Sequence, residues 1–371
     1  MHDLLLNEYL IKKDRLSEYL EKKSLDGVFL TRRSNYSWLT CGARNKIADC
    51  ADNGSASLLF CKDKLYLFTT NIEMQRMINE EINNFSFMEC VEYKWFKPKD
   101  LEKKVASIVA LNKIRQDAVI LDGAKLMDND FNEVKYCLTD GEKSRYKKLG
   151  KMSTECITAT CNEIKKGMSE FNIQAILSDN LISLGITPWI ILVASDERLF
   201  KYRHPIPTNK KIEKYIMVVL GAMKWGLIVS ITRMIHFEKP EKEIIRARDL
   251  ILRIDAEMIL SSRPGMKYSD VLRNEIKIFS EFGMKDEWEN HHQGGPMGYE
   301  GRYFLTNLHN EEIIEVNHAI GWNPSMRGYK SEDTIIVEED KNNIITQDSG
   351  WPLIKIETKY GNVLRPNLLI V

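Results

Sequence analysis

The sequence predicts an α+β protein. Helix-like periodicity, with apolar residues three and four positions apart, comes in separate blocks, and strand-like apolar runs come in neighbouring pairs. A doubly wound parallel sheet would instead alternate single strands with helices along the chain. A chain of 371 residues is longer than most domains that have a single hydrophobic core, so we expect two domains.

The first part of the chain has the pattern of a small α/β domain. Leu6 to Lys22 has the apolar spacing of an amphipathic helix, and Asn71 is placed to cap a helix that runs to about Asn83. The predicted strands are Gly27–Thr31, Ser57–Phe60, Leu65–Thr69 and Val119–Leu121. The two middle strands are close enough to form a hairpin.

The polar, turn-rich segment Asp140–Ser144 marks the predicted boundary between a domain of residues 1–142 and one of residues 143–371. A long helix should follow from about Tyr146 to Lys166, and Ser169 is an N-cap for the next helix. Two more helices are expected at Ile244–Leu260 and Tyr268–Phe282. The expected strands are Tyr215–Leu220, Leu227–Thr232, Glu312–Val316, Asp333–Val337 and Asn343–Thr346.

Charge and composition exclude several classes of function. The chain has 53 basic and 53 acidic residues, so no net charge attracts it to nucleic acid or to an anionic membrane. The N-terminus lacks a signal-peptide pattern, and no apolar run reaches the roughly 18 residues of a membrane-spanning helix. The seven scattered cysteines are typical of reduced thiols. We therefore expect a cytoplasmic protein whose partner is a small-molecule or peptide-like substrate.

Four short segments carry a resemblance to a known family. In chain order they are Arg198–Thr208, Gly221–Arg233, His291–Tyr299, and Trp322–Ser325 with Lys330–Thr334. Together they resemble the catalytic domain of the creatinase, prolidase and methionine aminopeptidase family, and the first half is similar to its creatinase-type N-terminal domain. The resemblance implies a C-terminal pita-bread domain over residues 143–371, a creatinase-like domain over residues 1–142, and a homodimer.

Most of the metal ligands that the resemblance implies are missing. Metal-dependent members hold two ions with two Asp, one His and two Glu, whose carboxylates neutralise the ions while a bound water is activated. The corresponding positions here are Val219, Ser230, His292, Asn323 and Glu332. Three carboxylates are thus replaced by Val, Ser and Asn. We therefore predict no pair of metal ions and no cofactor, with a single weakly held metal ion on His292, Glu332 and one neighbour as the alternative.

The polar residues that remain are the candidate catalytic groups. Creatinase, a metal-free member of the family, splits a C–N bond with a histidine as acid and base, and this histidine resembles either His204 or His292 by region. An imidazole that titrates near neutral pH suits that task. Glu332 would hold a cationic substrate group or orient His292. Because His291 and His292 are adjacent, they would point to opposite faces of a strand, and we expect only one to enter the site.

Further side chains are candidates for substrate contacts. Arg302 could hold a carboxylate through two parallel hydrogen bonds, and the amide of Asn323 could position a carbonyl group. The full set of predicted substrate-binding residues is Asn323, Arg302, Tyr299, Trp322, Ser230 and His291.

Three functions remain in competition. The first is a metal-independent enzyme that acts on a C–N bond of a small amino, guanidino or peptide-like compound, with hydrolysis as the default and a biosynthetic lyase or cyclase reaction as a variant. The second is a non-catalytic pita-bread protein that binds a peptide or a partner. The third is an Xaa-Pro metallopeptidase, which requires bound metal.

Overall fold

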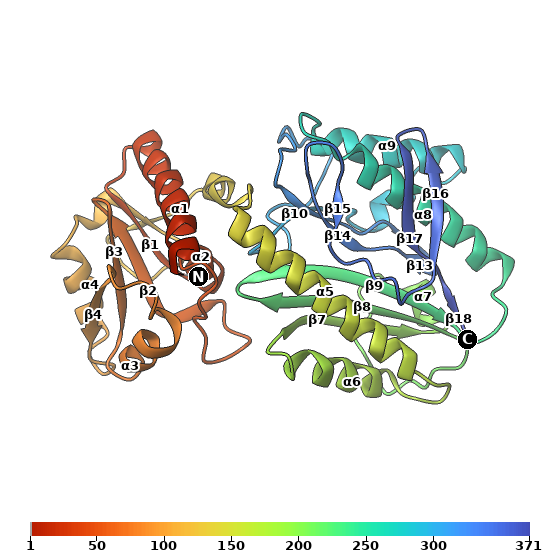
Figure 1. Ribbon diagram of the computed structural model, residues 1–371, viewed down its shortest axis with the longest axis horizontal. Helices are drawn as coiled ribbons and strands as arrows, with labels where there is room; N and C mark the ends of the chain where they lie inside the picture. The colour runs from red at the N-terminus through yellow and green to blue at the C-terminus, as the bar shows by residue number, and fades with distance from the viewer. Residues whose placement is uncertain (1) are drawn as a thin grey trace. The chain divides into compact units, whose positions relative to one another are not determined.

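The computed structural model describes residues 2–371, which form two compact units (Figure 1). The first unit comprises the chain up to Lys135 together with Thr139–Glu142, and the second comprises Tyr136–Leu138 and Lys143–Val371. Helices and strands are mixed in both units, and the predicted α+β class is confirmed.

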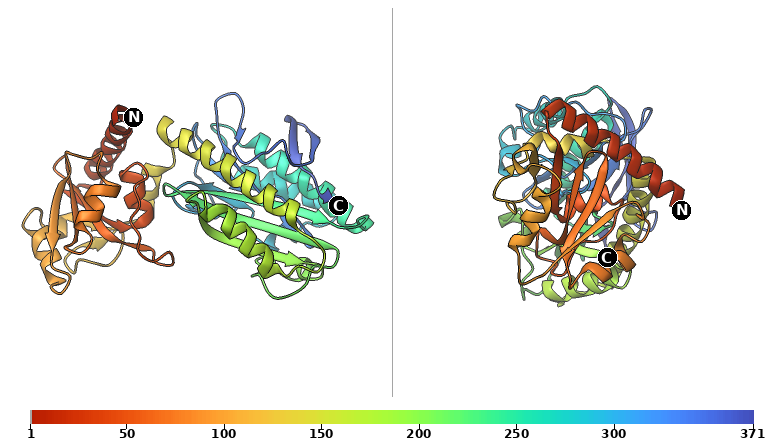
Figure 2. Two further views of the ribbon diagram at one scale, coloured as in Figure 1. Left: turned by 60° about the horizontal axis from the view of Figure 1, so that its bottom comes forward. Right: turned by 90° about the vertical axis from the view of Figure 1, so that its left-hand side faces the viewer.

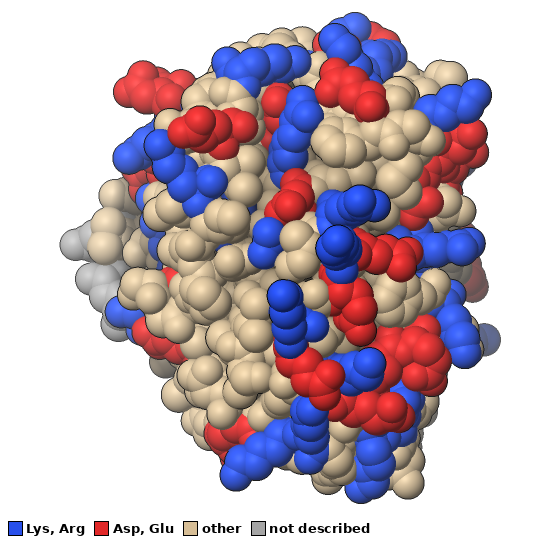
Figure 3. All heavy atoms as spheres, turned by 90° about the vertical axis from the view of Figure 1, so that its right-hand side faces the viewer, with Lys and Arg blue, Asp and Glu red and all other residues tan. Residues whose placement is uncertain are grey.

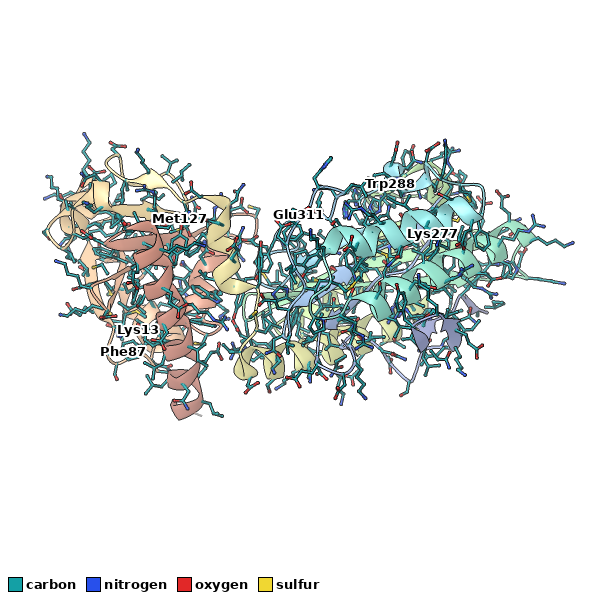
Figure 4. All side chains as sticks on the ribbon, turned by 90° about the horizontal axis from the view of Figure 1, so that it is seen from above. Lys13, Phe87, Met127, Lys277, Trp288 and Glu311 are labelled. Atoms are coloured by element: carbon teal, nitrogen blue, oxygen red, sulfur yellow. The ribbon has the colours of Figure 1, made fainter. Side chains whose placement is uncertain are left out.

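The first unit contains a six-stranded sheet in the order β4-β3-β2-β1-β5-β6. Its strands are β1 (Gly27–Arg32), β2 (Asn53–Cys61), β3 (Lys64–Thr70), β4 (Glu89–Tyr93), β5 (Ile114–Gln116) and β6 (Lys125–Leu126). Its helices are α1 (His2–Lys23), α2 (Arg33–Leu39), α3 (Met74–Arg76), η1 (Met77–Glu81), α4 (Lys99–Ala106), η2 (Leu111–Lys113) and η3 (Asn129–Lys135). Phe87 lies beside α1 (Figure 4), where its ring centroid is 4.7 Å from that of Tyr9.

Two sequence predictions for this unit are wrong. Asn71 does not cap a helix, because its side-chain oxygen accepts a hydrogen bond from the backbone N–H of Trp95, and α3 begins only at Met74. The short helix then widens into the π turn η1. Val119–Leu121 is not a strand, because the strand that pairs with β1 is β5, a few residues earlier.

The second unit is built around a four-stranded sheet in the order β18-β9-β8-β7. Its strands are β7 (Thr187–Ser195), β8 (Tyr215–Lys224), β9 (Leu227–His236), β10 (Gly294–Met297), β11 (Ala319–Trp322), β12 (Ser325–Met326), β13 (Tyr329–Lys330), β14 (Asp333–Ile336), β15 (Asn343–Ile344), β16 (Leu353–Thr358), β17 (Gly361–Pro366) and β18 (Leu369–Ile370). Its helices are α5 (Asp140–Glu163), α6 (Glu170–Ile182), α7 (Arg198–Lys201), α8 (Lys242–Ser261), α9 (Tyr268–Glu281) and η4 (Glu287–Asn290). Strands β10, β11, β14 and β15 form a second sheet.

Strand β8 is buried along nearly its whole length. Met217 and Val219 belong to a core that also contains residues of α8, α9, β11 and β14. The alternate residues Val218 and Leu220 are equally buried, and α5 and α6 run alongside this sheet (Figures 1 and 2). A sheet covered on both faces needs continuous apolar strands, which explains the run Tyr215–Leu220.

Helix α5 starts earlier than the sequence suggests. Asp140–Ser144, which we expected to be a turn, forms the beginning of the helix. Thr139 and Glu142 form a reciprocal cap, in which the Glu142 carboxylate accepts from the Thr139 N–H at 2.8 Å and the Thr139 hydroxyl accepts from the Glu142 N–H at 3.2 Å. Ser169 caps α6 in the same manner, as predicted. Glu312–Val316 is not a strand and contributes only an isolated bridge at Ile313.

A buried group of charges joins distant parts of the second unit. The guanidinium of Arg365 is 2.6 Å from a carboxylate oxygen of Asp255 and 2.7 Å from one of Asp333, and all three side chains are fully buried. Arg233 approaches the other oxygen of Asp333 at 3.2 Å. Two cations thus face two carboxylates, which leaves the group electrically balanced.

Surface charges are mixed in sign. On the face shown in Figure 3, Lys and Arg side chains lie among Asp and Glu, as the equal totals of basic and acidic residues suggest. No helix within residues 2–371 has a stretch long and apolar enough to cross a lipid bilayer.

Candidate functional site

The site begins on one face of the β8–β9 hairpin. Val219 is paired with Thr232, and Ser230 lies two residues before Thr232, so these side chains share a face of the sheet. The segment that contains Glu332 runs beside β9, where the Thr232 N–H donates to the Glu332 carbonyl at 3.0 Å. The Thr232 hydroxyl also donates to the Glu332 carboxylate at 2.9 Å. The hairpin thus fixes the carboxylate in place.

Glu332 is 4 % exposed and is paired with two cations. The ammonium of Lys330 is 2.8 Å from one carboxylate oxygen, and the guanidinium of Arg302 is 3.3 Å from the other. Burial alone would raise the pKa of Glu332, but Lys330 and Arg302 outweigh it, and the pKa is lowered below its usual value. Glu332 is therefore an anion at neutral pH.

Arg302 lies between two of the sequence-predicted site residues. Besides Glu332, its guanidinium donates to the Ser230 hydroxyl at 3.4 Å and to the Gly301 carbonyl at 2.6 Å. A Cβ atom at position 321 would lie only 2.9 Å from the central guanidinium carbon, so the glycine there makes room for this arginine. Arg302 is thus held by the protein itself, although its buried Nε has no hydrogen-bond partner among the described residues.

Three histidines meet beside this group. Nε2 of His291 is 3.1 Å from Nε2 of His204, and Nδ1 of His291 is 3.0 Å from the Ser325 hydroxyl. The rings of His291 and His292 stack, with centroids 4.4 Å apart and planes at 30°. The expectation that they point to opposite faces is wrong, because this segment follows η4 as irregular chain and is not a strand. Trp288 of η4, labelled in Figure 4, receives the His291 N–H on its carbonyl.

The three imidazoles are uncharged at neutral pH. Burial, aided by Arg302 and Lys330, lowers the pKa of His292 to about 4. Burial and the neighbouring Lys330 also lower the pKa of His291 and of His204, and Glu332 opposes the effect at His204. Because His204 is the most exposed of the three, it connects the cluster with solvent.

Three other predicted substrate contacts, Asn323, Trp322 and Tyr299, are all buried but differ in their hydrogen-bond partners. Asn323 follows β11, is 2 % exposed, and has a side-chain oxygen with no partner within the described part of the chain. The ring of Trp322 belongs to the core and its N–H donates to the Ser262 hydroxyl, so its role as a substrate contact stays a prediction. Tyr299 is buried, so a substrate could reach it only if the surrounding chain moved.

With this geometry in place, comparison with known proteins identifies the family. The profile of metallopeptidase family M24 matches residues 144–339, more than half of the chain. The chain belongs to metallopeptidase family M24.

Sequence relatives within the family are distant. An uncharacterized peptidase of Staphylococcus epidermidis is 22 % identical over 233 residues, which cover 60 % of this chain and 65 % of the relative. The matched part of the chain therefore spans slightly less than two thirds of that relative. An uncharacterized peptidase of Staphylococcus saprophyticus is 20 % identical over 352 residues, which cover 91 % of this chain and 99 % of the relative.

Solved structures confirm the pita-bread fold. An Xaa-Pro dipeptidase from Bacillus anthracis has a TM-score of 0.77 at 18 % identity and covers 98 % of this chain and 100 % of its own. A prolidase from Pyrococcus horikoshii has a TM-score of 0.76 at 18 % identity, with coverages of 91 % and 98 %. The N-terminal domain of the FACT complex subunit SPT16 from Cicer arietinum has a TM-score of 0.71 at 13 % identity, with coverages of 93 % and 97 %. At these identities the likeness shows the fold alone.

The residues present do not fit the pair of metal ions that the family name implies. Val219 lies in the apolar core, and Arg302 contacts both Ser230 and Glu332, where ligands would have to converge on an ion. Lys330 takes the remaining side of the Glu332 carboxylate. A metal ion here would have to displace two cations from a single carboxylate, and few anionic ligands would remain to hold it.

Sequence reasoning missed several residues of this site. Lys330 is one of them. Its position two residues before Glu332 could have predicted the contact, because side chains two residues apart point to the same face of an extended chain. Ser325 orients His291, and Arg203 is paired with Glu287, but no local pattern indicates either contact. A separate cluster of Cys137, Glu315 and His318 also lies in the second unit.

Proposed function

We propose that this member of family M24 is a hydrolase that splits a C–N bond of a small amino, guanidino or peptide-like substrate without the family's pair of metal ions. The observation that carries the proposal is the contact of Arg302 and Lys330 with Glu332, at 3.3 and 2.8 Å. Two protein cations already neutralise the carboxylate that would otherwise bind metal. The same cations can stabilise negative charge that develops on the substrate.

His204 is the acid and base in this proposal. It is exposed and uncharged, and its Nε2 is 3.1 Å from that of His291. When His204 donates this hydrogen bond, its Nδ1 keeps a free lone pair. Nδ1 can then take the proton of a water molecule whose oxygen forms a bond to the substrate carbon, and return that proton to the nitrogen as the C–N bond breaks.

Other residues position His204 and the substrate. Ser325 fixes the orientation of His291, and His291 in turn orients His204. The unpartnered oxygen of Asn323 can accept a hydrogen bond from a substrate N–H group. On the same grounds of resemblance as before, we propose a cytoplasmic homodimer, and light scattering during gel filtration would reveal the mass of the assembly.

The first test compares activity and metal content in one preparation. Protein purified without added metal is treated with a chelator, analysed for bound transition metals, and assayed with Xaa-Pro dipeptides and small guanidino compounds. We expect turnover with less than stoichiometric metal. His204→Asn should abolish this turnover, while His309→Asn, at an exposed histidine outside the cluster, should leave it unchanged. Equal activity of the two variants would remove His204 from the mechanism.

Two other functions are compatible with the fold that this chain shares with the SPT16 domain and the Bacillus anthracis Xaa-Pro dipeptidase. A non-catalytic binding protein would bind peptides in the chelated state and release them unchanged. A metallopeptidase would be inactive after chelation and regain dipeptide hydrolysis with added metal. The chelation assay therefore distinguishes all three functions.

A further inference from the structure

The charges around the three histidines do not balance. Arg203 and Glu287 form an ion pair and cancel each other. Lys330 and Arg302 both contact Glu332, so two cations share one carboxylate. One positive charge is left over in a group whose side chains are at most 12 % exposed.

Several polar atoms of this group have no partner among the described residues. Nε of Arg302 is a buried hydrogen-bond donor without an acceptor, and Nδ1 of His292 is buried and unpaired as well. For Lys330, Glu332 is the partner recorded within residues 2–371, although an ammonium group can donate three hydrogen bonds. A buried donor without an acceptor, next to excess positive charge, is a group that an anion would complete.

A transition metal is the competing occupant, since His204, His291 and His292 each offer a ligand atom and these atoms lie within 4.8 Å of one another. The neighbouring charges decide between the two. A divalent cation would add two positive charges beside an excess that already exists, with no carboxylate among its three ligands. An anion would remove that excess and would accept hydrogen bonds from Lys330, from Nε of Arg302 and from the N–H group of His292.

We propose that Lys330, Arg302 and the three histidines form a binding site for a small oxyanion, a carboxylate or a phosphate group, and not for a transition metal. This inference rests on the proposed function in one respect: it assigns an anionic group to the substrate of the hydrolase. The anion lies against the Lys330 ammonium, and His204, as the most exposed histidine, marks the side from which solvent reaches the cluster.

Calorimetric titration of the purified full-length protein tests the site without any turnover assay. The probes are inorganic phosphate and acetate, each at low ionic strength, with zinc chloride in a parallel titration in a phosphate-free buffer. We expect saturable binding of at least one anion at one site per chain, and no stoichiometric binding of zinc that depends on His204. Binding of phosphate alone assigns a phosphorylated compound, and binding of acetate alone assigns a carboxylate. Failure of both anions to bind overturns the proposal, whatever the activity assay shows.

Two variants with opposite expected effects link the binding to the cluster. Lys330→Met should weaken the anion about tenfold or more, because a charge-assisted hydrogen bond and the excess charge are lost together. Glu332→Gln removes the competing carboxylate and should strengthen anion binding about tenfold. A variant that merely unfolds could not bind more tightly. Lys355→Met, at an exposed lysine, is the matched control and should bind like the original chain. Unchanged affinity in both Lys330→Met and Glu332→Gln overturns the proposal.

Discussion

The ammonium of Lys330 lies 2.8 Å from the carboxylate of Glu332, and both side chains are almost completely buried. Water is largely excluded from this pair, so each charge depends on the other. This burial distinguishes the pair from the exposed ion pairs of the chain, because water solvates the charges of an exposed pair whether or not the pair is formed.

Loss of one partner should be costly at this position. Lys330→Met removes a charge-assisted hydrogen bond to a buried carboxylate, although Arg302 still balances the charge of Glu332, and we expect the free energy of unfolding at pH 7 to fall by about 1.5–3 kcal/mol. Lys355→Met breaks an exposed contact with Glu357 and should change it by less than about 1 kcal/mol. Urea unfolding measures both. Similar losses in the two variants would show that the buried pair contributes no more than a surface pair.

Removal of a second buried acid should have the opposite effect and stabilise the folded protein. Glu275 in α9 is fully buried, neither carboxylate oxygen has a partner among the described residues, and burial together with the nearby Asp255 raises its pKa well above the usual value. A raised pKa in the folded state means that stability is lost as the pH rises above the unfolded value of 4.5. Glu275→Met should therefore raise the free energy of unfolding at pH 7.

The same variant supplies its own control through pH. At pH 4 the acid is protonated in the folded state and mostly protonated in the unfolded state, so the stabilisation by Glu275→Met should largely disappear. Thermal unfolding at pH 7 and pH 4 shows whether it does. An equal effect at both pH values would mean that packing, and not the proton, governs this position.

The histidine cluster should make the protein less stable in mild acid. The pKa of His292 is lowered to about 4 by burial, Arg302 and Lys330, from an ordinary value of 6.5. Between these two values the unfolded chain binds a proton that the folded chain does not, so stability falls as the pH drops through this window. His292→Gln should flatten this part of the stability profile, whereas His309→Gln should not. A profile that is unchanged by His292→Gln contradicts the buried, uncharged state of this imidazole.

The start of α5 offers a simple test of local structure. Thr139→Ala removes the hydroxyl that accepts the Glu142 N–H and should reduce the free energy of unfolding by about 1 kcal/mol. Thr139→Ser keeps that acceptor and should restore most of the loss. If alanine and serine give equal stability in chemical denaturation, the cap contributes little to the helix.

The sequence could predict the elements whose apolar pattern is long and regular. The helices α8 and α9 and the strands β8 and β9 lie where the apolar periodicity predicts them. Each helix buries one apolar face, and each strand is buried on both faces. It could not predict β5 at its true position, since a strand of three residues carries too little pattern. The start of α5 was missed for another reason, because its polar residues resemble a turn unless the reciprocal contact of Thr139 with Glu142 is recognised.

Prediction of the site had a similar limit. The motif spacing brought Ser230 and Glu332 to attention, and both do lie in one group. The placement of Arg302 between them and the contact of His204 with His291 are tertiary relationships between segments far apart in the chain. No local pattern records them, so residue types alone could suggest which groups were chemically useful but not which ones meet.

The buried contacts of Arg365 with Asp255 and Asp333 also have a consequence for synthesis of the chain. Until Arg365 has left the ribosome, the carboxylates of Asp255 and Asp333 lack the guanidinium group that contacts both of them in the folded state. Burying them earlier would leave unpaired charge in the core, which is strongly unfavourable. The second unit should therefore stay partly folded until the segment that contains Arg365 has been translated.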